Sequence, residues 1–230
     1  MASSRSWPFD DEDRPSGSVQ PLSQADLQAI LAHLGDDPDQ LLDGTDADRP
    51  VVAVRYLAEQ ATARAADGSS HVVAGWSAAF AAEAHALLGE ERKARLLLER
   101  ADFHLSKARA DDPMFGVFGR EQLGGFVGAC QLRLNDPRSA EAALQDSARR
   151  LGAGKEKHRS VILGDLSTAF VLQDDPEQAC AVLHQVIDLV ELTGSAAGKR
   201  RAFAAGRQLT RWRNEPFVQD VQDRLLALAS

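Results

Sequence analysis

A three-residue corner that ends in proline recurs along the chain, and it constrains the fold more than any other feature. The corner is Asn135-Asp136-Pro137, and it appears again as Asp174-Asp175-Pro176 and as Asn214-Glu215-Pro216. The middle acid can cap the start of a helix, and proline suits the first helical position, where no backbone N–H is needed. Gly89-Glu90-Glu91 stands in the equivalent place upstream. A corner repeated in this way predicts a unit of structure that repeats along the chain.

Apolar residues recur at helical spacing between the corners, and this predicts pairs of antiparallel helices joined by short connections. Aromatic residues make up only 6% of the chain, and few windows are rich in β-branched residues, so a sheet is not expected. We therefore expect an all-α fold in which stacked helix pairs share one continuous core. The predicted helices lie near residues 71–88 and 91–108, 115–134 and 137–151, 157–173 and 176–193, and 196–212 and 216–228.

Superposing the corners predicts which residues meet where two helices cross. Small residues at a crossing let the two backbones approach closely, and a larger side chain fills the groove beside them. The aligned alanines are Ala94, Ala140 and Ala179, the leucines four residues later are Leu98, Leu144 and Leu183, and the small residues twelve positions before the alanines are Ala82, Gly128 and Ser167. The three leucines are expected to be buried, and Leu144→Ala is expected to cost ~2–5 kcal/mol.

This pattern of small residue, alanine and leucine around an Asp-Pro corner resembles a degenerate tetratricopeptide (TPR) repeat. The region from about Ala82 to Leu228 is similar to the TPR-like C-terminal region of actinobacterial XRE-type transcriptional regulators. The resemblance rests on GACQLRLNDPRSAEAAL (Gly128–Leu144), LSTAFVLQDDPEQACAVL (Leu166–Leu183) and LTGSAAGKRRAFAAGRQLTRW (Leu192–Trp212). It implies a TPR-like α-α superhelix and a role in transcriptional regulation. That family carries a helix-turn-helix before the array, whereas residues 1–50 here offer one acidic helix.

Charge divides the chain into an acidic beginning and a balanced remainder. Residues 1–50 hold eleven acids and three arginines, while residues 51–230 hold 23 acids and 23 basic residues. The expected organisation is a disordered acidic leader over 1–20, a short helix (21–34) with a linker over 21–50, and a TPR-like helical repeat domain over 51–230 that begins with a helix over 50–66. No signal-peptide pattern and no apolar run of membrane-spanning length is present, so a cytoplasmic location is expected.

The sequence predicts a protein that is not an enzyme and that uses no cofactor and no metal. Gly152 to Lys155 lacks the glycine spacing, the hydroxyl residue and the preceding strand of a phosphate-binding loop. The six histidines are scattered, and none stands at metal-ligand spacing from a cysteine or another histidine. Cys130 and Cys180 are expected to be buried free thiols.

The last repeat carries the candidate binding site. Six basic residues and no acid lie between Ser195 and Arg213. If the repeats superpose, the inner face of the superhelix has Trp76 near one end and arginines toward the other. Arginine forks bind carboxylates at two points, so this face predicts a groove for an acidic protein or peptide partner. The predicted contact residues are Trp76, Arg133, Arg201, Gln208 and Arg211.

Four alternatives stay open from the sequence alone. The basic residues could form a solvated helix paired with Glu215, Asp220 and Asp223. The chain could form a homodimer, with the acidic leader in the basic groove of its own or a second copy. It could be a regulator that contacts nucleic acid directly through its basic C-terminal helices, which the acidic leader makes the weaker choice. It could also be a small-molecule or peptide sensor, with the glycine-rich helix over 115–134 as a pocket wall.

Overall fold

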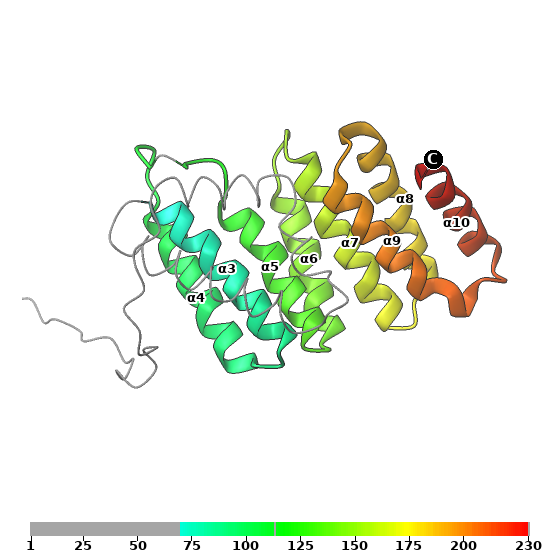
Figure 1. The fold of residues 1–230 in the computed structure, drawn as a ribbon, viewed down its shortest axis with the longest axis horizontal. Coiled ribbons are helices and arrows are strands. Elements are labelled where there is room, and N and C mark those ends of the chain that lie inside the picture. Colours follow the sequence, from blue (N-terminus) through cyan, green and yellow to red (C-terminus); the bar gives the residue numbers. More distant parts are fainter. Residues whose placement is uncertain (1–69, 113, 230) are drawn as a thin grey trace, which may run out of the picture. The chain divides into compact units, whose positions relative to one another are not determined.

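The computed structural model describes residues 70–112 and 114–229, which all belong to the unit Asp36–Ser230. This part of the chain contains eight α-helices and one short 3₁₀ helix and no strand, which confirms the expected all-α fold (Figure 1). The predicted leader (1–20) and the predicted helices over 21–34 and 50–66 lie outside the described residues. None of the described helices has the length and apolar character needed to cross a membrane.

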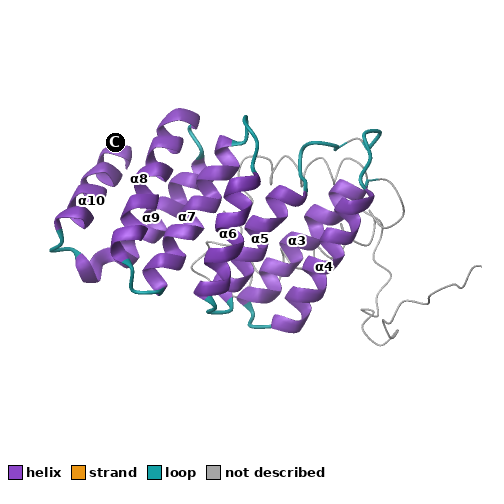
Figure 2. Ribbon diagram, turned by 180° about the vertical axis from the view of Figure 1, so that it is seen from behind, coloured by secondary structure: helices purple, strands orange, loops and turns teal. Residues whose placement is uncertain are grey.

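Successive helices form pairs whose members pack against each other along their lengths (Figure 2). The three complete pairs are α3 (His71–Leu87) with α4 (Glu91–Lys107), α5 (Arg120–Arg133) with α6 (Pro137–Arg150), and α7 (Glu156–Leu172) with α8 (Pro176–Thr193). They are followed by α9 (Ala196–Gln208), the 3₁₀ helix η4 (Leu209–Trp212) and α10 (Pro216–Ala229).

The pairs stack so that their first helices form one layer and their second helices another. α3 contacts α5, α5 contacts α7 and α7 contacts α9, whereas α4, α6 and α8 each contact the first helix of the following pair (Figure 1). The last helix, α10, packs against α8 and α9. Each pair thus buries its apolar stripe against its neighbours, as expected of a helical repeat.

The predicted helix boundaries agree with the structure to within two residues, with two exceptions. The helix expected over 115–134 begins at Arg120, because Gly116 lies at a positive φ of 82° and Gly119 is the N-cap. The helix expected over 196–212 is α-helical only to Gln208 and continues as 3₁₀ helix to Trp212.

The corners of the first three pairs share one backbone design. The second residue after each first helix is in the left-handed conformation, and the N–H of the residue that follows it donates to the carbonyl five residues back, as in a Schellman motif. These left-handed residues are Gly89, Asn135 and Asp174, and the hydrogen bonds are Glu90 to His85 (2.9 Å), Asp136 to Gln131 (2.8 Å) and Asp175 to Phe170 (3.0 Å). Asp136 and Asp175 also cap the following helix as predicted, accepting from the backbone N–H of Ser139 and Gln178. Glu90 makes no such bond.

The predicted crossing points are largely confirmed. Leu144 and Leu183 are 0% exposed, and the aligned alanines and small residues are buried. A Cβ added at Gly128 would lie 2.3 Å from Cγ of Leu144, so only glycine fits there. The prediction was wrong for Leu98, which is only partly buried beside the core. Cys130 and Cys180 are buried and free.

Candidate functional site

A network of buried charges joins the first helices of the stack. Its centre is Glu83 on α3, whose side chain is 2% exposed. Its Oε1 lies 3.4 Å from Nη2 of Arg133 on α5 and 3.6 Å from Nη2 of Arg201 on α9. Nε of Arg201 lies 3.3 Å from Oδ1 of Asp165 on α7. Four helices therefore contribute to one set of ion pairs, and a buried carboxylate needs such partners to remain charged.

The approach of α9 to α7 explains why Arg201 reaches this network. A Cβ added at Gly164 on α7 would lie 2.5 Å from Cβ of Arg201, so the two helices meet at a residue without a side chain. Asp165 is the next residue along α7, and it is buried. The Arg201 side chain is only 13% exposed and the Arg133 side chain 31%. These two arginines are thus engaged with acids of the described chain.

Arg211 is bound to the end of α7 rather than to the acids that follow it. Its Nη2 donates to the carbonyl oxygen of Val171 at 2.8 Å and lies 2.5 Å from Oδ1 of Asp174. Its guanidinium carbon stands 3.7 Å from the centre of the Trp212 ring. In the described ion pairs, Arg201 and Arg211 therefore meet Glu83, Asp165 and Asp174, and not the acids Glu215, Asp220 and Asp223 that the solvated-helix alternative named.

Trp76 belongs to an aromatic cluster at the other end of the helix row. Its ring stacks on Phe118 with centroids 5.8 Å apart and lies 5.9 Å from Phe80, and Phe126 meets both phenylalanines edge-on. The side chain is partly buried and packs on the core of α3 and α5. Gln208 is exposed at the end of α9. The structure thus brings Arg133 and Arg201 together around Glu83 and places Trp76, Gln208 and Arg211 elsewhere.

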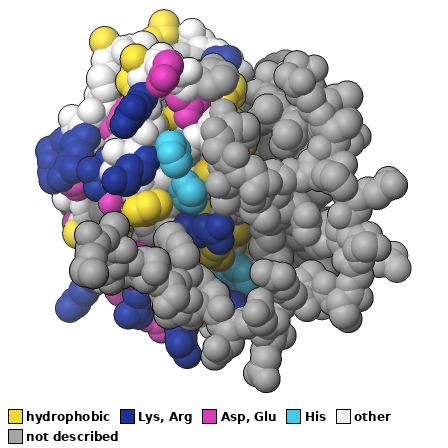
Figure 3. All heavy atoms as spheres, turned by 90° about the vertical axis from the view of Figure 1, so that its left-hand side faces the viewer, with side chains coloured by type: hydrophobic (Ala, Val, Ile, Leu, Met, Phe, Trp, Pro, Cys, Tyr) yellow, Lys and Arg dark blue, Asp and Glu magenta, His cyan; other side chains and the backbone are white. Residues whose placement is uncertain are grey.

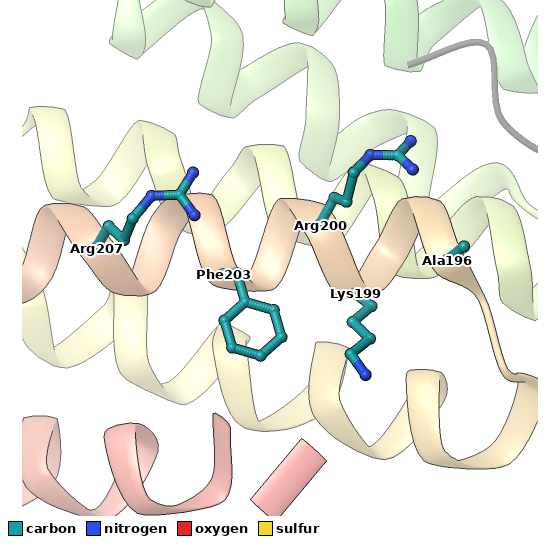
Figure 4. A pocket seen from close by; sticks show the side chains of 5 residues that line it. All are labelled: Ala196, Lys199, Arg200, Phe203 and Arg207. Atoms are coloured by element: carbon teal, nitrogen blue, oxygen red, sulfur yellow. The ribbon is translucent and has the colours of Figure 1, made fainter. Parts of the chain in front are cut away.

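A surface hollow of about 360 Å³ lies along α9. Its lining residues are Ala196, Lys199, Arg200, Phe203 and Arg207 (Figure 4). Arg200 and Arg207 project to one side of the helix in this view, and Lys199 and Phe203 to the other. No acid of the described chain lies within ion-pair distance of Lys199 or Arg207. Burial and the charge of Arg201 lower the pKa of Arg200.

Sequence reasoning identified the basic last repeat but not this face of it. The superposed repeats predicted Arg201, Gln208 and Arg211 as contact residues, of which Arg201 is largely covered by neighbouring helices. The lining residues recur at spacings of three and four residues, which brings their backbone positions to one part of the helix surface, while their side chains diverge to two sides. That spacing is visible in the sequence and could have revealed these positions.

The start of α3 and the loop after α4 are joined by a polar cluster. Asp112 accepts hydrogen bonds from Oγ of Ser70 (2.6 Å) and from the backbone N–H of Val72 (3.1 Å) and Met114 (3.0 Å). Beside them, Nδ1 of His71 and Nδ1 of the buried His104 lie 3.2 Å apart. Figure 3 shows histidine side chains reaching the surface at this end, next to Lys and Arg side chains. Burial, Arg100 and His71 lower the pKa of His104, so its neutral form is favoured.

The chemistry available in the described residues is limited. No group of three or more His, Cys, Asp or Glu side chains in residues 70–112 and 114–229 could hold a metal ion. Burial raises the pKa of both thiols, that of Cys180 to about 11, so neither is a thiolate at neutral pH. What the arrangement offers is a cationic surface with an apolar centre, which suits binding.

Comparison with known proteins found no match to this chain among family models, curated proteins or solved structures.

Proposed function

We propose that this chain is a non-enzymatic, TPR-like helical-repeat protein that binds a protein or peptide partner on its row of first helices. The observation that supports the proposal most is the hollow on α9, where Lys199 and Arg207 meet no acid of the described chain and Phe203 lines the same hollow. Arginine and aromatic residues are enriched at recognition surfaces, and the hollow presents both in Arg207 and Phe203.

The arginines predicted from the sequence divide into two roles. Arg133 and Arg201 neutralise Glu83 and Asp165, so they position the helices that build the binding face. Arg211, with a side chain 53% exposed, and the exposed Gln208 extend the surface of α9 at its C-terminal end and are accessible to a partner. Trp76 would contact a partner only if that partner extended along the row to α3.

A place in transcriptional regulation is the second part of the proposal, and it rests on the resemblance to XRE-type regulators. In that arrangement the repeat array is the sensor or scaffold half of a control unit. The partner would be a protein that carries the regulatory output, and this chain would not contact nucleic acid directly.

Site-specific photo-crosslinking tests the proposed binding face. A photoreactive benzoylphenylalanine at Gln208 lies on the binding face, and the same residue at Arg138, which is exposed on α6, serves as the matched control. Irradiation in the native cells is expected to give a covalent adduct with a discrete partner from position 208 and none from position 138. Equal adducts from both positions, or none from position 208, would overturn the proposed face.

A further inference from the structure

We infer that the hollow on α9 binds an extended acidic segment in which two acids flank an apolar residue, in the pattern acid–x–apolar–x–acid. The inference rests on the proposed function and specifies the chemistry of its partner. Lys199, Phe203 and Arg207 carry it, because they follow one another at intervals of four residues and line the same hollow, with Lys199 and Phe203 on one side of α9 and Arg207 on the other.

The spacing of these three residues sets the spacing of the ligand. They stand at intervals of four residues on one helix, so each step advances roughly 6 Å along the axis and turns by about 40°. The two cations are thus separated by roughly 12 Å along α9, with the phenylalanine midway. An extended chain advances about 3.3 Å per residue and directs every second side chain to the same face. Residues i, i+2 and i+4 of such a chain therefore match the spacing of the three positions along the helix axis, with the second acid reaching Arg207 across α9.

The charges around the hollow favour an anionic ligand. Lys199 and Arg207 have no acid of the described chain within ion-pair distance, and Arg200 adds a third positive charge to the lining. The neighbouring acids on the first-helix row, Glu83 and Asp165, are engaged with Arg201. On α8, Asp188 and Glu191 pair with Arg224 of α10. These four carboxylates of the described chain are thus already paired, and the side chains that line the hollow carry positive charge only.

The aromatic residue at the centre favours a peptide over nucleic acid. Phe203 is partly buried and packs on the core of the last pairs, so its exposed edge offers a fixed apolar contact between the two cations. A duplex backbone presents a continuous row of phosphates and would place charge against this ring. A peptide can place an aliphatic side chain there. The order cation–aromatic–cation is therefore complementary to acid–apolar–acid.

A titration of the full-length protein followed by NMR tests this directly. The probe is the capped peptide Ser-Glu-Ser-Leu-Ser-Glu-Ser, and the comparison peptide has the same composition with its two acids adjacent. The patterned peptide is expected to shift the amide signals of α9 and to bind about tenfold more tightly than its isomer. Lys199→Gln combined with Arg207→Gln is expected to weaken binding by about tenfold, since each exposed ion pair contributes modestly. Phe203→Ala is expected to remove the preference for the patterned peptide.

The matched control is Arg92→Gln combined with Arg138→Gln, which removes two positive charges from exposed positions on α4 and α6. It is expected to leave peptide affinity within a factor of two. Equal binding of the two peptides, equal weakening by both double variants, or tighter binding of duplex DNA than of the patterned peptide would each overturn the inference. An adduct at position 208 that the peptide does not block would also overturn it while leaving the proposed function standing. Absence of the adduct at position 208 when no peptide is added would remove the proposed function itself.

Discussion

The pair α3–α4 and the pair α7–α8 follow the same repeat pattern but are held together differently. In α7–α8 the corner is capped by the Asp175 side chain, and the leucine at the crossing point, Leu183, is completely buried. In α3–α4 the corner acid, Glu90, makes no capping bond and contacts the buried His85 instead, and the equivalent Leu98 is only partly buried.

The difference shows how a repeat can keep its backbone geometry while its interactions change. Both corners use a left-handed residue and the same backbone hydrogen bonds. What differs is the balance between apolar packing and polar contacts, since the first pair relies on histidines and on Asp112. We therefore expect the central pairs to be more sensitive to changes of core volume, and a pH dependence to be added in the first pair.

The largest expected effect comes from the crossing-point leucines. Leu183→Ala or Leu144→Ala should lower the free energy of unfolding by ~2–5 kcal/mol, because each leaves a cavity in a fully packed site. Leu98→Ala should cost clearly less, because its side chain is already partly exposed. Chemical denaturation of the three variants measures the comparison. Equal losses would mean that the two pairs are packed alike.

The charge network that includes both pairs should give the next effect. Arg201→Met should lower the free energy of unfolding by about 3 kcal/mol, because it leaves the buried Glu83 and Asp165 with fewer partners. Arg224→Met is the control, since it removes the ion pairs of Arg224 with the exposed acids Asp188 and Glu191 and should cost less than about 1 kcal/mol. If the Arg201→Met variant were as stable as the unmodified protein, the ion pair with Arg133 alone would be enough to compensate the buried charge of Glu83.

Removal of the corner cap should produce a smaller change. Asp175→Ala should cost about 1 kcal/mol, because the N–H of Gln178 loses its acceptor. Asp175→Asn keeps an acceptor oxygen and should retain most of the stability. Thermal unfolding of the two variants side by side measures the contribution of the cap, and identical melting temperatures would assign the corner's stability to its backbone bonds.

The smallest effect is a pH dependence that belongs to the first pair. Burial lowers the pKa of His104, so the unfolded chain takes up a proton more readily than the folded one, and stability is lost as the pH falls below about 6.5. For Asp112, burial alone would raise the pKa, but hydrogen bonds from Ser70, Met114 and Val72 outweigh it and lower the pKa, so its contribution is lost at still lower pH. His104→Gln should flatten the stability curve between pH 5 and pH 7. An unchanged slope would show that His104 does not contribute to it.

The fold could be predicted from the sequence because its signals are local. Corner residues, caps and apolar spacing act within a few residues, and they predicted most helix boundaries to within two positions. The prediction for Leu98 was wrong because the burial of a side chain depends on how closely the neighbouring helix pair packs against it. A local sequence pattern does not contain that information.

The candidate site was predictable only in part, for the same reason. The basic composition of the last repeat is visible in the sequence, but the partners of its arginines are not. Arg201 meets Glu83 and Asp165 because Gly164 lets α9 approach α7 closely. The close approach of α9 to α7 covers the side of α9 that carries Arg201. The hollow that Lys199 and Arg207 line stays accessible.

The contact between Glu83 and Arg201 joins positions 83 and 201, which lie in the first and last described first helices. A stack held only by neighbour-to-neighbour packing can lose its end units one at a time, since each repeat depends on the next alone. A link across the stack changes this, because fraying at either end would expose a charge buried at the other. The described helices should therefore unfold as one cooperative unit, and the link, which closes a long loop, should form late in folding.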